Sequence, residues 1–214
     1  MKPQLLIFDL DGTLVDSRKD LASAVNGMRS RYGLQPLPLE VVTGFVGGGA
    51  RNLVERALQQ SDVDVDEALS LYKRLYNTNL TIHTTTYNGV AVGLKKLSGA
   101  GHQLAVLSNK PGDASREILR HFSLHACFRS VIGGGDIEKL KPHPDGIRKL
   151  AFETGFGTSR TWMIGDHHTD LSAAKSAGVF SALVEYGFGD SRGMEANARF
   201  TSFEQLVAFF TGGE

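Results

Sequence analysis

The sequence has little cysteine, no long apolar run and no excess of charge of either sign. Cys127 is the only cysteine among 214 residues, so the chain cannot form a disulfide with itself, and a cysteine-based zinc site is disfavoured. Lysine and arginine total 23, as do aspartate and glutamate. This balance argues against nucleic acid or a membrane surface as the main partner, since both usually select a basic patch.

Long hydrophobic segments are also missing. No stretch of 18 apolar residues is present, which argues against a transmembrane helix. The apolar run at residues 4–8 is too short for a signal peptide, and acids follow it at once. We therefore expect a cytoplasmic protein that acts on a small molecule, with neither nucleic acid nor membrane as partner. The sequence leaves monomer and homodimer equally open.

Short apolar runs alternate with helical patterns over most of the chain, whose hydrophobic content is 41%. Strands are predicted at residues 4–8, 103–107, 130–133, 161–165 and 180–184, and helices at 90–98, 114–122, 145–154 and 169–177. Continuous apolar strands that alternate with helices are typical of a parallel sheet covered on both faces. The predicted fold class is therefore α/β, with a Rossmann-like parallel-sheet core.

Residues 17–83 interrupt this alternation. Helical patterns at 19–32, 39–45, 50–60 and 64–80 follow one another with no strand between them. We predict an all-helical insertion at 17–83, within an α/β core formed by 1–16 and 84–214. The alternative is that these helices simply pack on one face of the sheet.

Polar side chains gather where the predicted strands end. The first strand is followed by Asp9 and Asp11, the second by Ser108 and Asn109, and the strand at 161–165 by Asp166 and Asp170, with Lys141 in an intervening loop. Apart from Asp9, which directly follows Phe8, each alone has an ordinary explanation as a turn former, helix cap or loop residue. In a parallel sheet, however, ligands bind beyond the carboxyl ends of the strands. Clustered carboxylates suit magnesium, and a hydroxyl, an amide and an ammonium suit phosphoryl oxygens.

Four ordered motifs carry a family resemblance. They are "DLDGTLVDS" (9–17), "LSNKP" (107–111), "KPHPD" (141–145) and "IGDHHTD" (164–170). In this order they resemble the haloacid dehalogenase-like phosphohydrolases, and the helical insertion is similar to the C1 cap of that superfamily. With "FVGGGARNLVERAL" and "EYGFGD" added, the chain is most similar to bacterial phosphoglycolate phosphatases. It departs from them at His167, where serine or threonine is usual, and in "EYGFGD", where "TYGYN" is usual.

The resemblance implies a magnesium-dependent phosphomonoester hydrolase that forms an aspartyl phosphate, with 2-phosphoglycolate as the favoured substrate. Asp9 would be the nucleophile and Asp11 the general acid and base, whose backbone carbonyl also reaches the metal. The implied ligands of Mg²⁺ are Asp9, Asp11, Asp166 and Asp170. The implied phosphate-binding residues are Thr13, Ser108, Asn109 and Lys141. His167 and His168 are either substrate contacts or plain loop residues.

A glycine run, "GFVGGGARN" at 44–52, lies inside the helical insertion. Its spacing matches neither of the familiar nucleotide-binding loops. In a cap, Gly48 and Gly49 would let the loop approach the catalytic residues closely, and Arg51 would pair with an anionic leaving group. The alternative is a plain turn before a helix, with Arg51 in solvent.

Other functions remain open at this point. Another small phosphate, such as a sugar phosphate, pyrophosphate or a nucleotide, is an alternative substrate. A receiver-like module that is phosphorylated on an aspartate to switch a partner is the non-enzymatic alternative. A phosphonatase is disfavoured because residues 20–72 contain no lysine. Thr13 argues against a sugar phosphomutase, and Asp11 against a haloalkanoate dehalogenase.

Overall fold

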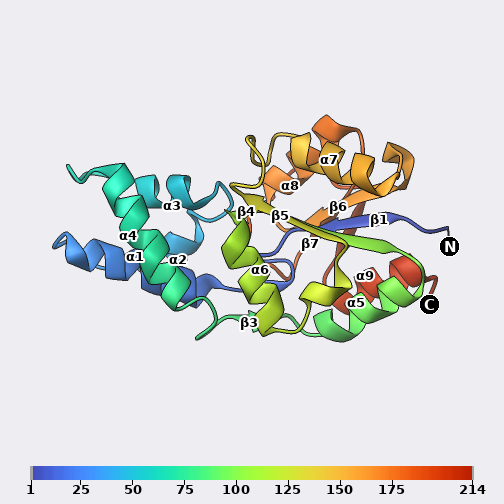
Figure 1. Cartoon of the computed structure of the whole chain (residues 1–214), viewed down its shortest axis with the longest axis horizontal. Helices are drawn as coiled ribbons and strands as arrows, with labels where there is room; N and C mark the ends of the chain where they lie inside the picture. The colour runs from blue at the N-terminus through green and yellow to red at the C-terminus, as the bar shows by residue number, and fades with distance from the viewer. Residues whose placement is uncertain (1, 214) are drawn as a thin grey trace.

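A six-stranded parallel sheet forms the centre of the protein, in a computed structural model that describes residues 2–213 (Figure 1). The strand order is β5-β4-β1-β6-β7-β8. The strands are β1 (Leu5–Phe8), β4 (Gln103–Pro111), β5 (Ser130–Gly134), β6 (Thr161–Gly165), β7 (Phe180–Val184) and β8 (Ala198–Phe200). Because the chain runs from β1 outward to β4 and β5, then returns to β6 on the other side, the topology reverses at β1. Ligand sites in open α/β sheets lie at such a reversal, beyond the strand ends.

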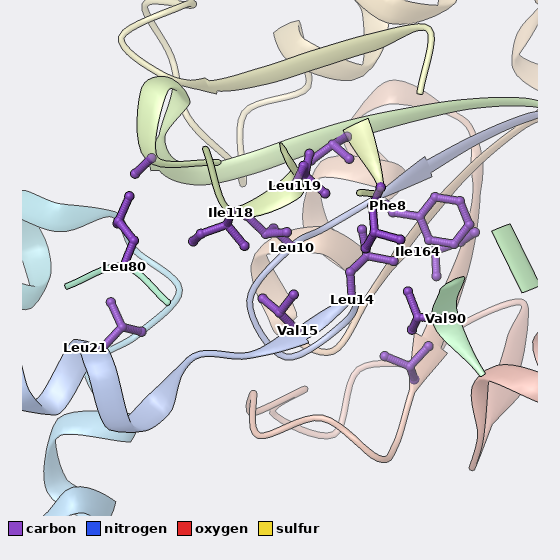
Figure 2. Close-up of a cluster of buried hydrophobic side chains, with 14 of the residues drawn as sticks. Phe8, Leu10, Leu14, Val15, Leu21, Leu80, Val90, Ile118, Leu119 and Ile164 are labelled. Carbon is purple, nitrogen blue, oxygen red and sulfur yellow. The ribbon is translucent and has the colours of Figure 1, made fainter. Parts of the chain in front are cut away.

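The side chains of β1 alternate between two apolar layers, and all four are fully buried. Leu6 and Phe8 face the layer covered by α5 (Val90–Gly99), α6 (Gly112–His121) and α9 (Phe203–Thr211). Figure 2 places Phe8 in this layer beside Ile164 and Val90. Leu5 and Ile7 face the layer covered by α7 (Asp145–Thr154) and α8 (His168–Ala177). A strand buried on both faces explains why its sequence is apolar throughout.

Four helices stand together beside the sheet, at the left of Figure 1. They are α1 (Arg18–Arg31), α2 (Leu39–Thr43), α3 (Ala50–Ala57) and α4 (Val65–Thr78). The chain enters this block through β2 (Val15–Asp16) and leaves it through β3 (Thr85–Thr86), and these two short strands pair antiparallel. The two chain connections between the block and the core therefore run side by side.

Apolar packing and one buried carboxylate fasten the base of the block. Leu21 and Leu80 belong to the same buried cluster as Leu10 and Val15, which follow β1 (Figure 2). The Asp20 carboxylate, itself buried, accepts hydrogen bonds from the backbone N–H groups of the two residues that precede β3. Apolar burial stabilises the folded protein by roughly 2.5 kcal/mol per 100 Å² of surface. The apolar contacts and the Asp20 hydrogen bonds together hold the base of the block against the core.

The predicted α/β class and the five predicted strands are confirmed. Three strands and one helix were not predicted: β2, β3, β8 and α9. β4 also continues to Pro111, beyond the predicted end at 107, because a register shift against β5 after Leu107 lets the polar residues "SNK" stay in the strand. Within residues 2–213, none of the helices combines the length and apolar character that crossing a membrane requires.

Candidate active site

A cavity of about 90 Å³ lies between the carboxyl ends of β1, β4 and β6 and the helical block. The sheet side of its wall carries Asp9, Asp11, Ser108, Lys110 and Asp166. The block side is mostly apolar and aromatic. A volume of this size suits a small polar molecule that is held at its polar end by the core.

Three buried carboxylates form a cluster, and two of them, Asp9 and Asp166, line the cavity. Asp9, Asp166 and Asp170 each offer one oxygen, and these oxygens lie within 4.8 Å of one another. Asp166 is held in place because its Oδ2 accepts the backbone N–H groups of Phe188 (3.0 Å) and Gly189 (2.7 Å). Hard oxygen ligands gathered at this distance fit a small divalent cation such as Mg²⁺.

Burial and mutual repulsion disfavour the ionised forms of these carboxylates, and a bound cation would stabilise them. Burial raises the pKa of Asp9 to about 6, and the carboxylates of Asp170 and Asp11 add to this rise while Lys141 opposes it. Burial, followed by repulsion from Asp9 and Asp170, also raises the pKa of Asp166 well above its usual value. Both shifts follow because loss of water and nearby negative charge disfavour the ionised carboxylate.

Lys141 lies behind Asp9 rather than on the cavity wall. Its ammonium is 3.0 Å from Asp9 Oδ1 and 2.7 Å from Asp170 Oδ1, and the side chain is 1% exposed. Burial alone would lower the pKa of Lys141, but the carboxylates of Asp170 and Asp9 outweigh it and the pKa lies above its usual value. The lysine therefore stays charged and neutralises part of the acidic cluster.

Asn109 connects Lys141 to the glycine loop. Its Oδ1 accepts the backbone N–H of Lys141 (2.8 Å), and its Nδ2 donates to the carbonyls of Lys141 (2.7 Å) and Gly47 (2.8 Å). We expected this amide to contact phosphate, but both of its ends are occupied by backbone groups. In this structure Asn109 is a positioning residue for Lys141 and for the loop.

Asp11 lies outside the acidic cluster and pairs with a lysine of its own. Both of its carboxylate oxygens accept from the Lys110 ammonium, at 2.9 and 2.8 Å, and Oδ1 also accepts from the Ser17 hydroxyl. The side chain of Asp11 is thus outside the set that could hold a metal, while it still lines the cavity. This separation suits a carboxylate that handles protons while others hold a cation.

Ser108 and Thr13 have different surroundings, although phosphate contact was expected of both. Ser108 lines the cavity at the end of β4. Thr13 is fully buried and lies outside the cavity lining. The cause is the tight turn after β1, in which the N–H groups of residues 13–15 all point to the carbonyl of Leu10. A phosphate contact through the Thr13 side chain is not available in this arrangement.

The glycine loop approaches the core through Gly47 and Gly49. Both adopt positive φ angles, 113° and 88°, which L-residues rarely adopt. A Cβ on Gly47 would lie 2.5 Å from the His167 ring, and one on Gly49 would lie 3.3 Å from the Asn109 carbonyl. Gly48, in contrast, faces the side chain of Asn52 on its own segment. Close approach of the loop to the core thus uses Gly47 and Gly49 but not Gly48.

Arg51 does not reach the cavity. It lies on the outer side of α3, 53% exposed, and its guanidinium pairs with Asp66 and with Glu55 (3.4 Å). We expected it to contact an anionic leaving group. Its two carboxylate partners belong to the helical block itself and hold it in solvent, on the side away from the site.

The two histidines also differ from each other. His167 lines the cavity and caps the N-terminus of α8. Burial, followed by the neighbouring His168, lowers the pKa of His167 to about 4, so its ring is neutral at physiological pH. His168 lies outside the cavity lining and its ring contacts the carbonyl of Asp190.

Lys110, Tyr72 and Tyr76 are cavity residues that the sequence analysis missed. The two tyrosines lie four positions apart on α4, and their rings stack with centroids 5.7 Å apart. Such a pair at helical spacing was a detectable signal. Lys110 had no such signal, because its burial depends on β4 continuing past Leu107.

Comparison with known proteins agrees with this geometry. The model of the haloacid dehalogenase-like hydrolase family matches residues 6–184. The phosphoglycolate phosphatase of Psychrobacter arcticus is 35% identical, over 98% of this chain and 96% of that protein. That of Neisseria meningitidis is 36% identical, over 87% of this chain and 82% of that protein. A crystal structure from Haemophilus somnus, named as a predicted phosphoglycolate phosphatase, has a TM-score of 0.90 at 27% identity and covers 98% of both chains.

Proposed function

Because the chain belongs to the haloacid dehalogenase-like hydrolase family, we propose that it is a magnesium-dependent phosphatase that converts 2-phosphoglycolate into glycolate and phosphate. The observation that carries the proposal is the position of Asp9, which lines the cavity at the end of β1, contacts the Lys141 ammonium and lies beside the other two carboxylates of the cluster. The names of the relatives support the choice of substrate. Other small phosphate monoesters are the alternative substrates.

Asp9 attacks phosphorus in the proposed mechanism. Its Oδ1 accepts from the backbone N–H of Leu10 (2.7 Å) and lies 3.0 Å from the Lys141 ammonium. These contacts orient the carboxylate and direct Oδ2 toward the substrate. Attack forms an Oδ2–phosphorus bond while the bond from phosphorus to the leaving oxygen breaks, which gives an aspartyl phosphate.

Asp11 moves the protons of both steps. In its acid form it protonates the leaving oxygen, and it then takes a proton from the water that attacks the aspartyl phosphate. The second attack breaks the Oδ2–phosphorus bond, so phosphate leaves and the Asp9 carboxylate is restored. The contacts of Asp11 with Lys110 and Ser17 hold its carboxylate beside the cavity.

The three carboxylates of the acidic cluster fit a magnesium ion. Asp9, Asp166 and Asp170 would hold it, with the backbone carbonyl of Asp11 as a further ligand. Bound Mg²⁺ supplies positive charge that offsets the repulsion between the Asp9 carboxylate and a phosphate dianion. Ser108 at the end of β4 would bind a phosphoryl oxygen, and the ammonium of Lys141 would hold Asp9 from behind and offset part of the negative charge of the site.

Residues 17–83 act as a cap in this proposal. The helical block forms the second wall of the cavity, and the Asn109–Gly47 hydrogen bond links it to the residue that positions Lys141. A cap that closes over the substrate excludes water and completes the site. This role also accounts for the glycines that let the loop meet the core.

The proposal is tested by phosphate release from a panel of phosphometabolites in the presence of Mg²⁺. We expect continuous turnover, with the highest kcat/KM for 2-phosphoglycolate. A higher value for a sugar phosphate, pyrophosphate or a nucleotide would move the assignment to that substrate. Release of no more than one phosphate per chain would point instead to a receiver-like module.

Gly47→Ala should lower kcat/KM roughly tenfold, since overpacking by one methyl group costs on the order of 1–3 kcal/mol. The added Cβ would collide with the His167 ring and push the loop away from the core. Gly33→Ala is the matched control: its φ of 68° is also positive, but no atom lies within 4 Å of the new Cβ. Activity at saturating and limiting substrate, with melting temperatures, would measure both.

Removal of the collision should restore activity. His167→Ser eliminates the ring, and serine is a good N-terminal cap for α8. The double variant Gly47→Ala/His167→Ser should therefore recover most of the lost kcat/KM. Equal losses in the Gly33 and Gly47 variants would show that backbone strain, and not loop position, determines the effect.

A further inference from the structure

The cavity contains a single basic side chain. Among residues 2–213, Lys110 is the only lysine or arginine in its lining, because Lys141 lies behind Asp9 and Arg51 faces solvent. The helical block contributes no charged side chain to the wall; its large side chains there are Leu21, Leu53, Tyr72 and Tyr76. Apart from the proposed metal, an anionic group on the leaving part of the substrate can therefore find a cationic partner only at Lys110.

Lys110 is held rigidly in this wall. Its side chain is 2% exposed. Two of its N–H groups point at the oxygens of Asp11, at 2.9 and 2.8 Å. The ammonium also lies 4.6 Å from the centroid of the Tyr76 ring, which stacks on Tyr72. A buried ammonium between a carboxylate and an aromatic face is fixed in place and weakly screened by solvent.

The chemistry of the leaving group brings it to the same place. In the proposed reaction the leaving oxygen must meet Asp11, so the atoms attached to that oxygen lie beside Asp11 and beside Lys110. A carboxylate one carbon away from the leaving oxygen would be repelled by Asp11 alone. Lys110 offsets this repulsion, and an ammonium has three donors, so it can keep Asp11 and still donate to the substrate.

We propose that Lys110 is the residue that selects substrates whose leaving group carries a carboxylate next to the phosphoester oxygen. This inference rests on the proposed phosphatase function and deepens it. It assigns to a strand residue of the core the recognition that Arg51 on the cap was expected to perform. The tyrosine pair on α4 then keeps the ammonium in place from the cap side.

The test compares 2-phosphoglycolate with ethyl phosphate, which has the same chain length and no carboxylate. Lys110→Met should reduce the ratio of the two kcat/KM values roughly 10- to 100-fold, the range typical of a hydrogen bond to a charged group. Lys110→Arg keeps the charge on a larger group and should therefore lower the ratio less than Lys110→Met does. Arg51→Met is the matched control and should leave the ratio unchanged. The ratio cancels any loss of folded enzyme and any damage to Asp11 that affects both substrates.

Binding gives a second measurement that needs no turnover. In an Asp9→Asn background with Mg²⁺, calorimetry would compare the affinities for 2-phosphoglycolate and ethyl phosphate with and without Lys110→Met. The lysine should account for the same preference there. A preference that survives Lys110→Met in both measurements, or that disappears in Arg51→Met, would overturn the inference and leave the phosphatase function intact. Release of phosphate from neither substrate by the wild-type protein would instead refute the proposed function, and the binding comparison would still decide the role of Lys110.

Discussion

Asp9→Asn should lower kcat/KM by roughly three or more orders of magnitude, as loss of an essential nucleophile does elsewhere. Asparagine has nearly the size of aspartate and can still accept from Leu10 and Lys141, the partners of Oδ1, but an amide is not a nucleophile toward phosphorus. Phosphate release from 2-phosphoglycolate with Mg²⁺ would measure the loss. An unchanged circular dichroism spectrum would establish that the variant is folded. Activity within tenfold of wild type would remove Asp9 from the mechanism.

Asp11→Asn should fail at a different step. The nucleophile remains, so a substrate with a good leaving group, such as p-nitrophenyl phosphate, should phosphorylate the protein slowly. Hydrolysis should then stall, since no carboxylate is present to activate the water. Mass spectrometry of rapidly quenched protein should find one phosphoryl group on Asp9. An adduct on any other residue would contradict the assignment of the two aspartates.

Removal of divalent metal should abolish turnover. Burial and mutual repulsion disfavour ionisation of Asp9 and Asp166, and without a cation a phosphate dianion would add further negative charge to the same site. We expect activity to be lost with EDTA, restored by Mg²⁺ and suppressed by Ca²⁺, because calcium adopts a looser and higher coordination that misplaces the nucleophile. Full activity in protein freed of metal would contradict the mechanism.

The same carboxylates make metal binding depend on pH. In the metal-free protein the pKa of Asp9 is raised to about 6, and a metal binds the ionised form. As pH falls below this pKa, the ionised fraction decreases about tenfold per pH unit, so the apparent dissociation constant for Mg²⁺ should rise by the same factor. Protonation of Asp166, whose pKa is also raised, should weaken Mg²⁺ binding in the same direction. Calorimetry with Mg²⁺ across this range would measure the dependence without reference to turnover.

Recognition of the leaving group is where sequence reasoning misplaced a side chain. Arg51 follows the glycine run and carries the right charge, so the sequence favoured it. In the structure it pairs with Asp66 and Glu55 within the block. Lys110 carries the same charge, but no sequence pattern indicated that it would line the cavity. Lys110 reaches the cavity because β4 continues past Leu107, whereas Arg51 lies outside the apolar face of α3, which buries Leu53, Val54 and Ala57.

Two of the predicted phosphate-binding residues differ for a similar reason. Asn109 is at the predicted strand end, yet its amide is occupied by the backbone of Lys141 and Gly47, which come from distant parts of the chain. Thr13 follows Asp11 closely, yet the turn that carries it closes on Leu10 and buries it. Position along the chain indicated the neighbourhood of both residues but not what they contact.

The sequence by itself determined the α/β class, the five central strands and the grouping of acids at one sheet edge. These follow from local properties: apolar runs bury strands on both faces, and the carboxyl ends of parallel strands necessarily meet. Only the tertiary structure decided that Lys110 enters the cavity, that Arg51 leaves it and that Gly47 touches His167. The positions of Lys110 and Gly47 depend on contacts with Asp11 and His167, which lie more than 90 residues away in the sequence. Arg51 pairs with partners only 4 and 15 positions away, but whether that pairing leaves it in solvent is decided by how the helical block packs against the sheet.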